Sequence, residues 1–184
     1  MKNIFNNIIL IYILIYFVSN VKIKIKAKEI LLKNDENFFR LEDILKENLD
    51  EKELIIRFDE DRYNMTNFKT HDLEIAPQYN LTLSGNKNGT IFDYNNNRRG
   101  LINLSISNPV GQVIKIENII FENVKNTDEL KNIFHILTRI HNHYLIIFEN
   151  CTFRNNDIQV FSLTNYCTKL YHENPSMILN NCTF

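Results

Sequence analysis

Hydrophobic and polar residues alternate along the C-terminal half of the chain, but the alternation changes phase at regular intervals. Ile114 and Ile116 lie on one face of a predicted strand. Ile119 and Phe121 also share a face, yet they are out of step with the first pair. Side chains of a single strand alternate with a period of two throughout. The pattern therefore predicts two short strands joined by a tight corner, with both apolar pairs pointing into one interior.

The same corner occurs three times at a nearly constant spacing. Its central residues are Asn118, Asn150 and Asn181. They are separated by 32 and 31 residues (150 − 118 and 181 − 150), and a phenylalanine follows each after three positions. Repetition with such a period is typical of solenoid proteins, in which each repeat forms one coil. Stacking the coils predicts three interior columns: Ile116, Phe148 and Leu179; Ile119, Cys151 and Cys182; and Phe121, Phe153 and Phe184.

Further short apolar runs complete the predicted coils. The candidates for a third strand in each coil are Leu101–Ser107, Ile133–Thr138 and Ile158–Leu163. An earlier and more divergent coil is predicted from Asn80–Gly85 and Gly89–Phe92. Residues 133–140 also fit one face of a helix, so two interpretations of this segment stay open. Together the runs predict nearly four coils.

A helical pattern precedes the repeats. The apolar residues at helical spacing, with charged residues between them, are Phe38, Leu41, Leu45 and Leu49. They predict a short amphipathic helix. A solenoid has to cover the open apolar end of its first coil, and a helix with one apolar stripe suits this role.

Three stretches carry a resemblance to a known architecture. They are Leu81–Asn86, Ile116–Asn123 and the two Asn-Cys-Thr-Phe corners that begin at Asn150 and Asn181. These runs resemble right-handed parallel β-helix repeat proteins, the pectate-lyase-like architecture. The resemblance implies an all-β fold, a right-handed parallel β-helix of about four coils. It implies little about activity, because that architecture includes lyases, hydrolases, adhesins and proteins with no known activity.

The domain organisation follows from these patterns. Residues 28–52 are predicted to form a linker and the N-terminal cap helix, and residues 53–184 the β-helix repeats. The fourth coil is unfinished at Phe184. An intact solenoid normally ends in a cap that covers its apolar edge. We therefore expect a truncated product, a gene-model fragment, or a partner that completes the stack.

The first residues have the pattern of an export signal. Lys2 supplies a positive start, and Ile8–Val18 is an unbroken apolar run that is too short for an ordinary membrane-spanning helix. With cleavage near Asn20 or Ala27, residues 1–27 are predicted to be a signal peptide. An uncleaved anchor and a core element are the alternatives. The prediction is a secreted protein, extracellular or at the cell surface, with no membrane span after signal removal.

Asn-x-Ser/Thr sequons agree with export. The candidate glycosylation sites are Asn64, Asn80, Asn88 and Asn103. Asn150 and Asn181 also lie in sequons and have two competing interpretations, a glycan or a structural ladder. In the ladder, the inward amides of Asn118, Asn150 and Asn181 hydrogen-bond from coil to coil. Asn118 holds the same position without being part of a sequon, which favours the ladder.

Charge and cysteine content narrow the function classes. The net charge of −1 and the pI near 6.5 provide no field that would recruit nucleic acid. The cysteines, Cys151, Cys167 and Cys182, lack the spacing of a zinc site. Cys151 and Cys182 occupy equivalent positions in successive repeats, so a disulfide and a buried pair of free thiols are both open. No cofactor or metal is predicted.

Candidate catalytic groups are few. A pectate-lyase-like enzyme needs acidic residues that hold Ca²⁺ and a basic side chain that accepts a proton. The nearest set is Asp59, Glu60, Asp61, Arg62, Asp93, Arg98 and Arg99. A solvated turn explains these charges, as a polar turn explains His141 and His143. Cys167 has no His or Asp partner at a recognisable spacing.

These observations favour a non-catalytic β-helix module whose partner is a polysaccharide or another protein. The strands of the predicted binding face expose amide and hydroxyl groups, for example Asn103, Ser105 and Gln159. Tyrosines at predicted turns or strand ends suit stacking on sugar rings or burial of the ring: Tyr79, Tyr94, Tyr144, Tyr166 and Tyr171. The alternative function is a fragment of a polysaccharide lyase or hydrolase.

Overall fold

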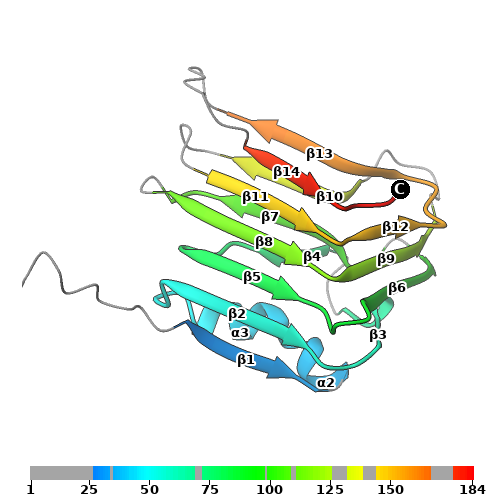
Figure 1. The fold of residues 1–184 in the computed structure, drawn as a ribbon, viewed down its shortest axis with the longest axis horizontal. Coiled ribbons are helices and arrows are strands. Elements are labelled where there is room, and N and C mark those ends of the chain that lie inside the picture. Colours follow the sequence, from blue (N-terminus) through cyan, green and yellow to red (C-terminus); the bar gives the residue numbers. More distant parts are fainter. Residues whose placement is uncertain are drawn as a thin grey trace, which may run out of the picture.

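The computed structural model is a parallel β-solenoid of about four turns (Figure 1). It describes residues 27–33, 35–68, 72–97, 99–108, 111–125, 132–138, 144–166 and 176–184. The predicted signal peptide therefore lies almost entirely outside the described residues. Each turn of the chain adds one strand to each of three sheets, and every strand pair is parallel. The predicted β-solenoid of about four coils is confirmed.

The three sheets run along the stack. Sheet A contains, in order, β1 (Lys28–Leu32), β2 (Glu53–Phe58), β5 (Asn80–Ser84), β8 (Gln112–Glu117), β11 (Tyr144–Glu149) and β14 (Met177–Asn180). Sheet B contains β3 (Arg62–Asn64), β6 (Thr90–Asn97), β9 (Ile119–Val124) and β12 (Thr152–Arg154). Sheet C contains β4 (Asp72–Ile75), β7 (Leu101–Ile106), β10 (Asn132–Thr138) and β13 (Gln159–Asn165). The 3-10 helix η1 (Met65–Asn67) follows β3.

The corner between sheets A and B is made by one asparagine in a left-handed conformation. The φ angles of Asn118, Asn150 and Asn181 are 57°, 53° and 52°. Asparagine tolerates this region better than most residues with a side chain. Because the corner residue breaks the alternation, Ile116 before it and Ile119 after it both point into the core and are buried. The corner predicted from the phase change is confirmed.

The interior columns form as predicted. Phe148 is in register with Ile116 below it and Leu179 above it. The rings of Phe121 and Phe153 stack with centroids 5.2 Å apart and an interplanar angle of 9°. Phe184 continues this column at 5.2 Å from Phe153. Such stacking adds roughly 0.5–1.5 kcal/mol per pair to the stabilisation from burial.

The other predicted strands are also present. The runs predicted as third strands of each coil are β7, β10 and β13 of sheet C. Residues 132–138 are extended, so the helical interpretation of this segment is wrong over its described part. Pairing with β7 and β13 on both sides satisfies the backbone of β10, and a helix at this place would leave the facing edges of β7 and β13 unpaired. The divergent earlier coil is confirmed as β5 and β6.

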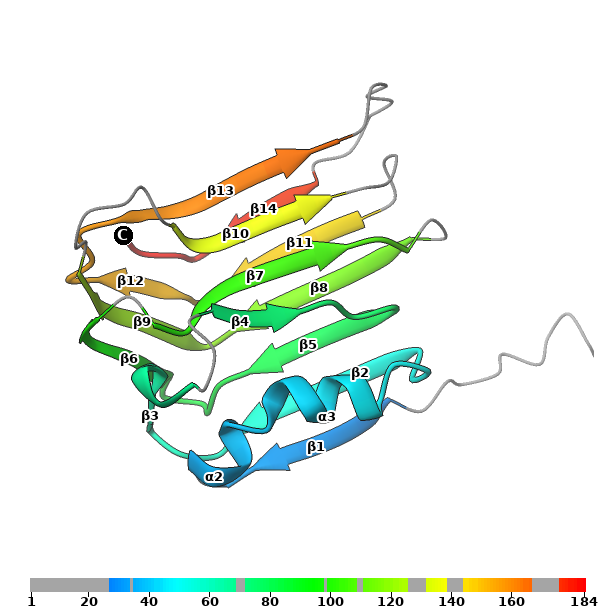
Figure 2. The ribbon, with the colours of Figure 1, turned by 180° about the vertical axis from the view of Figure 1, so that it is seen from behind.

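The N-terminal cap differs in detail from the prediction. The predicted single helix is two short helices, α2 (Asp35–Phe38) and α3 (Leu41–Glu47). Strand β1 precedes them and pairs with β2, in a segment that the sequence assigned to a linker. Helix α2 contacts β3, and α3 contacts β4. Figure 2 shows both helices at the β1 end of the stack, so β1, α2 and α3 together replace a first coil.

Aromatic packing joins the cap to the first coils. The Phe38 ring is fully buried and lies 4.5 Å from Tyr63, 5.8 Å from Phe58 and 5.2 Å from Phe92, measured between centroids. Burying an aromatic side chain of this size stabilises the fold by roughly 1.5–3 kcal/mol. Within the described residues, no helix combines the length and the hydropathy needed to cross a membrane.

The central phenylalanine column allows a direct test of the core. We expect Phe121→Ala to lower the free energy of unfolding by about 3–5 kcal/mol, because the ring is fully buried between two coils. Ile120→Ala on the same strand is the control and should cost much less, since Ile120 points outward. Chemical denaturation followed by circular dichroism measures both values. Equal losses in the two variants would contradict the assigned interior.

Candidate functional site

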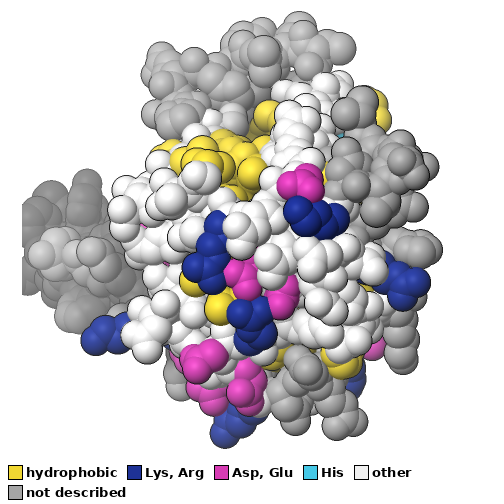
Figure 3. Space-filling view, turned by 90° about the vertical axis from the view of Figure 1, so that its right-hand side faces the viewer, with side chains coloured by type: hydrophobic (Ala, Val, Ile, Leu, Met, Phe, Trp, Pro, Cys, Tyr) yellow, Lys and Arg dark blue, Asp and Glu magenta, His cyan; other side chains and the backbone are white. Residues whose placement is uncertain are grey.

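Charged side chains line up on the outer face of sheet B because its strands are in register. Asp93, Glu122 and Arg154 occupy equivalent positions in β6, β9 and β12. Arg62 forms ion pairs with Asp93 and, at 3.0 Å, with Glu122. Arg154 contacts Glu122 from the other side at 2.6 Å. We call these four residues the charged ladder, and Figure 3 shows Lys, Arg, Asp and Glu side chains grouped on this face.

The environment of Asp93 favours its ionised form. Burial by itself would raise the pKa of this carboxyl group. Hydrogen bonds from the Asn123 amide at 2.9 Å and the Asn95 backbone N–H at 2.8 Å, together with the charge of Arg62, outweigh burial and lower the pKa. Glu122 is more enclosed, with 6% of its side chain exposed between the two arginines. Both carboxylates are thus held in ion pairs within the protein.

The charged ladder contains part of the set considered for catalysis. Arg62 and Asp93 come together as an ion pair, whereas the Asp61 carboxylate accepts a hydrogen bond from Asn86 at 2.7 Å. Asp59, Glu60 and Arg99 are exposed and do not join the ladder, and Arg98 lies outside the described residues. The sequence pattern had not indicated Glu122 and Arg154 as members of this site. Their separation of 32 residues, one coil, is the signal that could have identified them.

Sheet A carries a second set of ion pairs on its outer face. Lys115 contacts Glu117 at 2.6 Å and Glu149 at 2.5 Å. Hydrogen bonds to these two carboxylates raise the pKa of Lys115. Burial alone would raise the pKa of Glu117, but hydrogen bonds from Lys115 and from the Ser84 hydroxyl at 2.9 Å lower it. Asn180 extends the row by donating to Glu149 at 3.2 Å.

The corner asparagines are connected from coil to coil. Asn150 Nδ2 donates to Asn118 Oδ1 at 3.2 Å, and Asn181 Nδ2 donates to Asn150 Oδ1 at 2.7 Å. The row stops below Asn118, where Gly85 holds the equivalent position. A Cβ atom on Gly85 would lie 2.0 Å from the Asn118 carbonyl oxygen, so this corner requires glycine.

The predicted inward orientation of this asparagine ladder is wrong. Asn150 and Asn181 are exposed and Asn118 is half-buried. The reason is the phase change itself. Ile116 and Ile119 face inward, so the two residues between them, Glu117 and Asn118, both face outward. The exposure of Asn150 and Asn181 removes burial as an argument against glycans at these two sequons.

The candidate glycosylation sites differ in their local contacts. Asn64 Oδ1 accepts a hydrogen bond from the Thr66 N–H at 3.0 Å, and Asn80 Oδ1 accepts one from the Val113 N–H at 2.9 Å. Asn103 Nδ2 donates to Glu74 at 2.6 Å. Asn88 lies in an exposed turn closed by a hydrogen bond from its own N–H to Asn86.

The outer face of sheet C, which we call the polar face, is formed mainly by amide, hydroxyl and imidazole groups. One column contains Glu74, Asn103, His135 and Ser162, and the next contains Ser105, Leu137 and Thr164. These residues are exposed or half-buried. His135 Nε2 lies 3.3 Å from Thr164 Oγ1 and links the top two coils. None of the described sheet C residues is Lys or Arg.

The tyrosines and cysteines divide between the core and the surface. Tyr94 and Tyr144 are buried and so unavailable for sugar stacking, whereas Tyr79 and Tyr166 are exposed. The thiols of Cys151 and Cys182 are free. Burial raises the pKa of Cys151 to about 12. Tyr171, Cys167, His141 and His143 lie outside the described residues.

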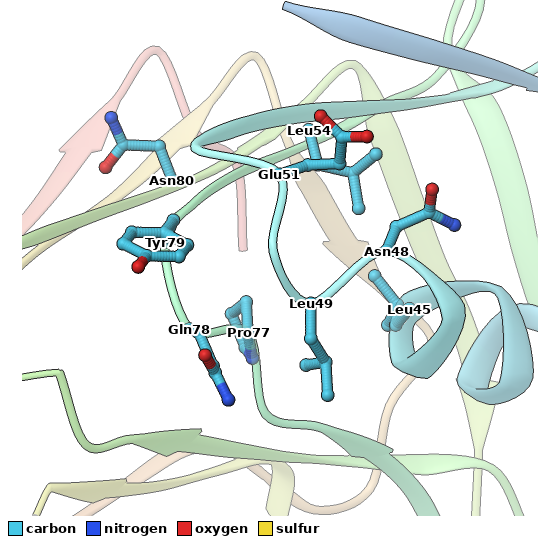
Figure 4. Close-up of a pocket in the computed structure, with 9 residues that line it drawn as sticks. All are labelled: Leu45, Asn48, Leu49, Glu51, Leu54, Pro77, Gln78, Tyr79 and Asn80. Carbon is cyan, nitrogen blue, oxygen red and sulfur yellow. The ribbon is translucent and has the colours of Figure 1, made fainter.

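A shallow depression separates the cap from the second coil (Figure 4). Its apolar wall includes Leu45, Leu49 and Tyr79. Figure 4 shows that the polar ends of Glu51 and Gln78 point away from each other, so no convergent set of polar groups forms here. In the described part of the chain, no group of three or more His, Cys, Asp or Glu side chains is arranged to hold a metal ion.

Comparison with known proteins adds no assignment. No protein-family model, curated protein or solved structure matches the chain.

The charged ladder predicts a specific loss of stability in acid. Because the pKa of folded Asp93 lies below its ordinary value of 3.8, its contribution is present above that pH and is lost as the pH falls through the folded pKa. The Asp93→Asn variant should therefore lose less unfolding free energy than the original protein when the pH falls from neutral to below the folded pKa of Asp93. Urea denaturation at several pH values measures how the unfolding free energy of each protein changes with pH. The same pH dependence of the unfolding free energy in the two proteins would contradict the stabilising role of ionised Asp93.

The corner residue Asn150 contributes to stability in two ways, through its side-chain hydrogen bonds and through its tolerance of the left-handed backbone conformation. Asn150→Ala loses two side-chain hydrogen bonds and places alanine at a φ of 53°, so we expect a loss of about 2 kcal/mol in unfolding free energy. Asn150→Gly loses the same hydrogen bonds but accepts the φ angle readily, so its loss should be smaller. Thermal and urea denaturation compare the two variants. A glycine variant less stable than the alanine variant would contradict the role of backbone conformation.

Proposed function

We propose that the protein is a non-catalytic β-solenoid module that binds an extended polysaccharide on the polar face of sheet C. The observation that carries the proposal is the pair of in-register columns on this face. Successive coils repeat hydrogen-bonding groups at the strand spacing of about 4.8 Å. Asn103, His135 and Ser162 thus present an amide, an imidazole and a hydroxyl in a row. A linear polymer of hydroxyl-rich units can contact such a row at several coils at once.

The charge of the polar face defines the class of polysaccharide. Its described strands have no Lys or Arg that would pair with an acidic sugar. Glu74 is one of its acidic residues, and its carboxylate already accepts a hydrogen bond from Asn103. An uncharged polysaccharide therefore suits this face better than a polyuronate, whose carboxylates would meet no cation.

The contacts of the other two faces support the choice of sheet C. The ionic groups of sheet B are occupied in the charged ladder, where Arg62 and Arg154 enclose Glu122. On sheet A, Lys115 bridges Glu117 and Glu149. These side chains hold neighbouring coils together. The same pairing makes a lyase or hydrolase less suitable, because a catalytic carboxylate has to be available to the substrate.

The proposal includes export and a right-handed coil. Export rests on the leader pattern of Lys2 and Ile8–Val18 and on the sequons. A right-handed coil is the general rule for crossovers between parallel strands of one sheet. An exported binding module would meet polysaccharide at the cell surface or in the extracellular matrix.

Binding to neutral polysaccharides tests the proposal. The double variant His135→Ala, Ser162→Ala removes an imidazole and a hydroxyl from the polar face, and we expect it to weaken binding about tenfold, equivalent to ~1.4 kcal/mol. Thr82→Ala on the outer face of sheet A is the matched control and should bind as the original protein does. Affinity electrophoresis in gels containing neutral or acidic polysaccharides measures both. Absence of retardation in every neutral gel, or equal weakening by the control, would refute the proposed site.

A further inference from the structure

Asn88 differs from the other sequon asparagines in the contacts of its side chain. It is exposed, and within the described part of the chain its side-chain amide has no hydrogen-bond partner. The other five sequon asparagines all use their side-chain amides in hydrogen bonds: Asn64, Asn80, Asn103, Asn150 and Asn181. A group attached to the Asn88 side chain therefore breaks no contact of the fold.

At several of the other sequons the amide nitrogen itself is in use. Asn103 Nδ2 donates to Glu74 at 2.6 Å, and Asn150 Nδ2 donates to Asn118 Oδ1 at 3.2 Å. Each of these bonds joins two neighbouring coils and uses the nitrogen to which an N-linked glycan attaches. A glycan at either site would weaken the contact between the coils. On Asn103 it would also cover the polar face.

The turn that carries Asn88 is ordered by other groups. The Gly89 N–H donates to the Asn86 carbonyl oxygen at 3.0 Å and closes the turn. Asn86 Oδ1 accepts the Asn88 N–H at 3.0 Å, a contact typical of asparagine in turns. Thr90, the hydroxyl residue of the sequon, is buried, and its hydroxyl oxygen accepts the Asn86 N–H at 2.9 Å. The Asn88 side chain thus lies on an ordered turn without contributing to it.

We propose that Asn88 is the main site at which this protein carries an N-linked oligosaccharide. The proposal rests on the export included in the proposed function, because the donor is a lipid-linked oligosaccharide of the secretory pathway. In the transfer, Nδ2 of Asn88 loses a proton and bonds to the anomeric carbon of the sugar. The bond from that carbon to the pyrophosphate of the lipid breaks, and the lipid pyrophosphate leaves together with the proton.

The position of Asn88 is compatible with binding on the polar face. Its turn joins β5 of sheet A to β6 of sheet B (Figure 1). A glycan at this corner therefore leaves the outer face of sheet C uncovered.

Production of the full chain in a eukaryotic host tests the proposal, once with its own N-terminus and once behind a leader known to direct secretion. Enzymatic removal of glycans in heavy-oxygen water marks each asparagine that carried one. Peptide mass spectrometry of cells and medium then measures the occupancy of all six sequons. We expect the highest occupancy at Asn88. An unmodified Asn88 in both preparations, or an occupancy no higher than at Asn103 and Asn150, would overturn the proposal.

Variants made in bacteria, without glycans, test the contacts on which the proposal depends. Asn88→Gln should leave the urea midpoint unchanged, because its amide holds no other group. Asn150→Gln is the matched control and should lower the midpoint, since it disturbs hydrogen bonds to Asn118 and Asn181. Equal losses in the two variants would overturn the proposal.

The same preparations separate this site from the proposed function. A glycan on Asn88 that forms only behind the added leader would support the site and refute export by the chain's own N-terminus. Absence of binding to every neutral polysaccharide would refute the polar face, whereas a glycan on Asn88 of the same protein would still support this site.

Discussion

The structure depends on the in-register stacking of successive coils, and that stacking depends on the left-handed corner residue. At Asn118, Asn150 and Asn181 the backbone adopts a φ angle that most residues avoid. This single conformation reverses the alternation of side chains, so strands on both sides of the corner point their apolar residues inward. A coil without the reversal would expose one of its two apolar sets. Each corner therefore allows a coil to enclose a core and to place the next coil directly above it.

In-register stacking also determines how the outer surface can be built. Each outward side chain lies beside its equivalents in neighbouring coils, so identical charges would meet and repel. In the charged ladder Asp93 and Glu122 do lie side by side, and Arg62 offsets their repulsion by forming ion pairs with both, while Arg154 contacts Glu122 as well. Lys115 has the same role between two glutamates on sheet A. Ion pairs on these two faces thus connect coils, and the polar face of sheet C is the one built mainly from uncharged groups.

The two ends of the stack differ in how far their core side chains are covered. At the β1 end, Phe38 from α2 enters the aromatic cluster and is fully buried. At the other end, Phe184 stacks on Phe153 on one side only and remains largely exposed. Ion pairs of Lys28 and Glu29 surround the capped end, whereas the described residues of β13, β14 and 181–184 contain no charged side chain.

Local sequence patterns determined the main features of the fold. The phase change around Asn118 predicted the corner, and the 31- to 32-residue period predicted the column of Phe121, Phe153 and Phe184, because both depend only on the order of residues along the chain. The tertiary structure decided which residues meet between coils. Glu122 lies between Arg62 and Arg154, two residues far apart in sequence, and their pairing depends on the lateral register of three coils. The pairing of β1 with β2 was decided in the same way, since it leaves no periodic signal in its own segment.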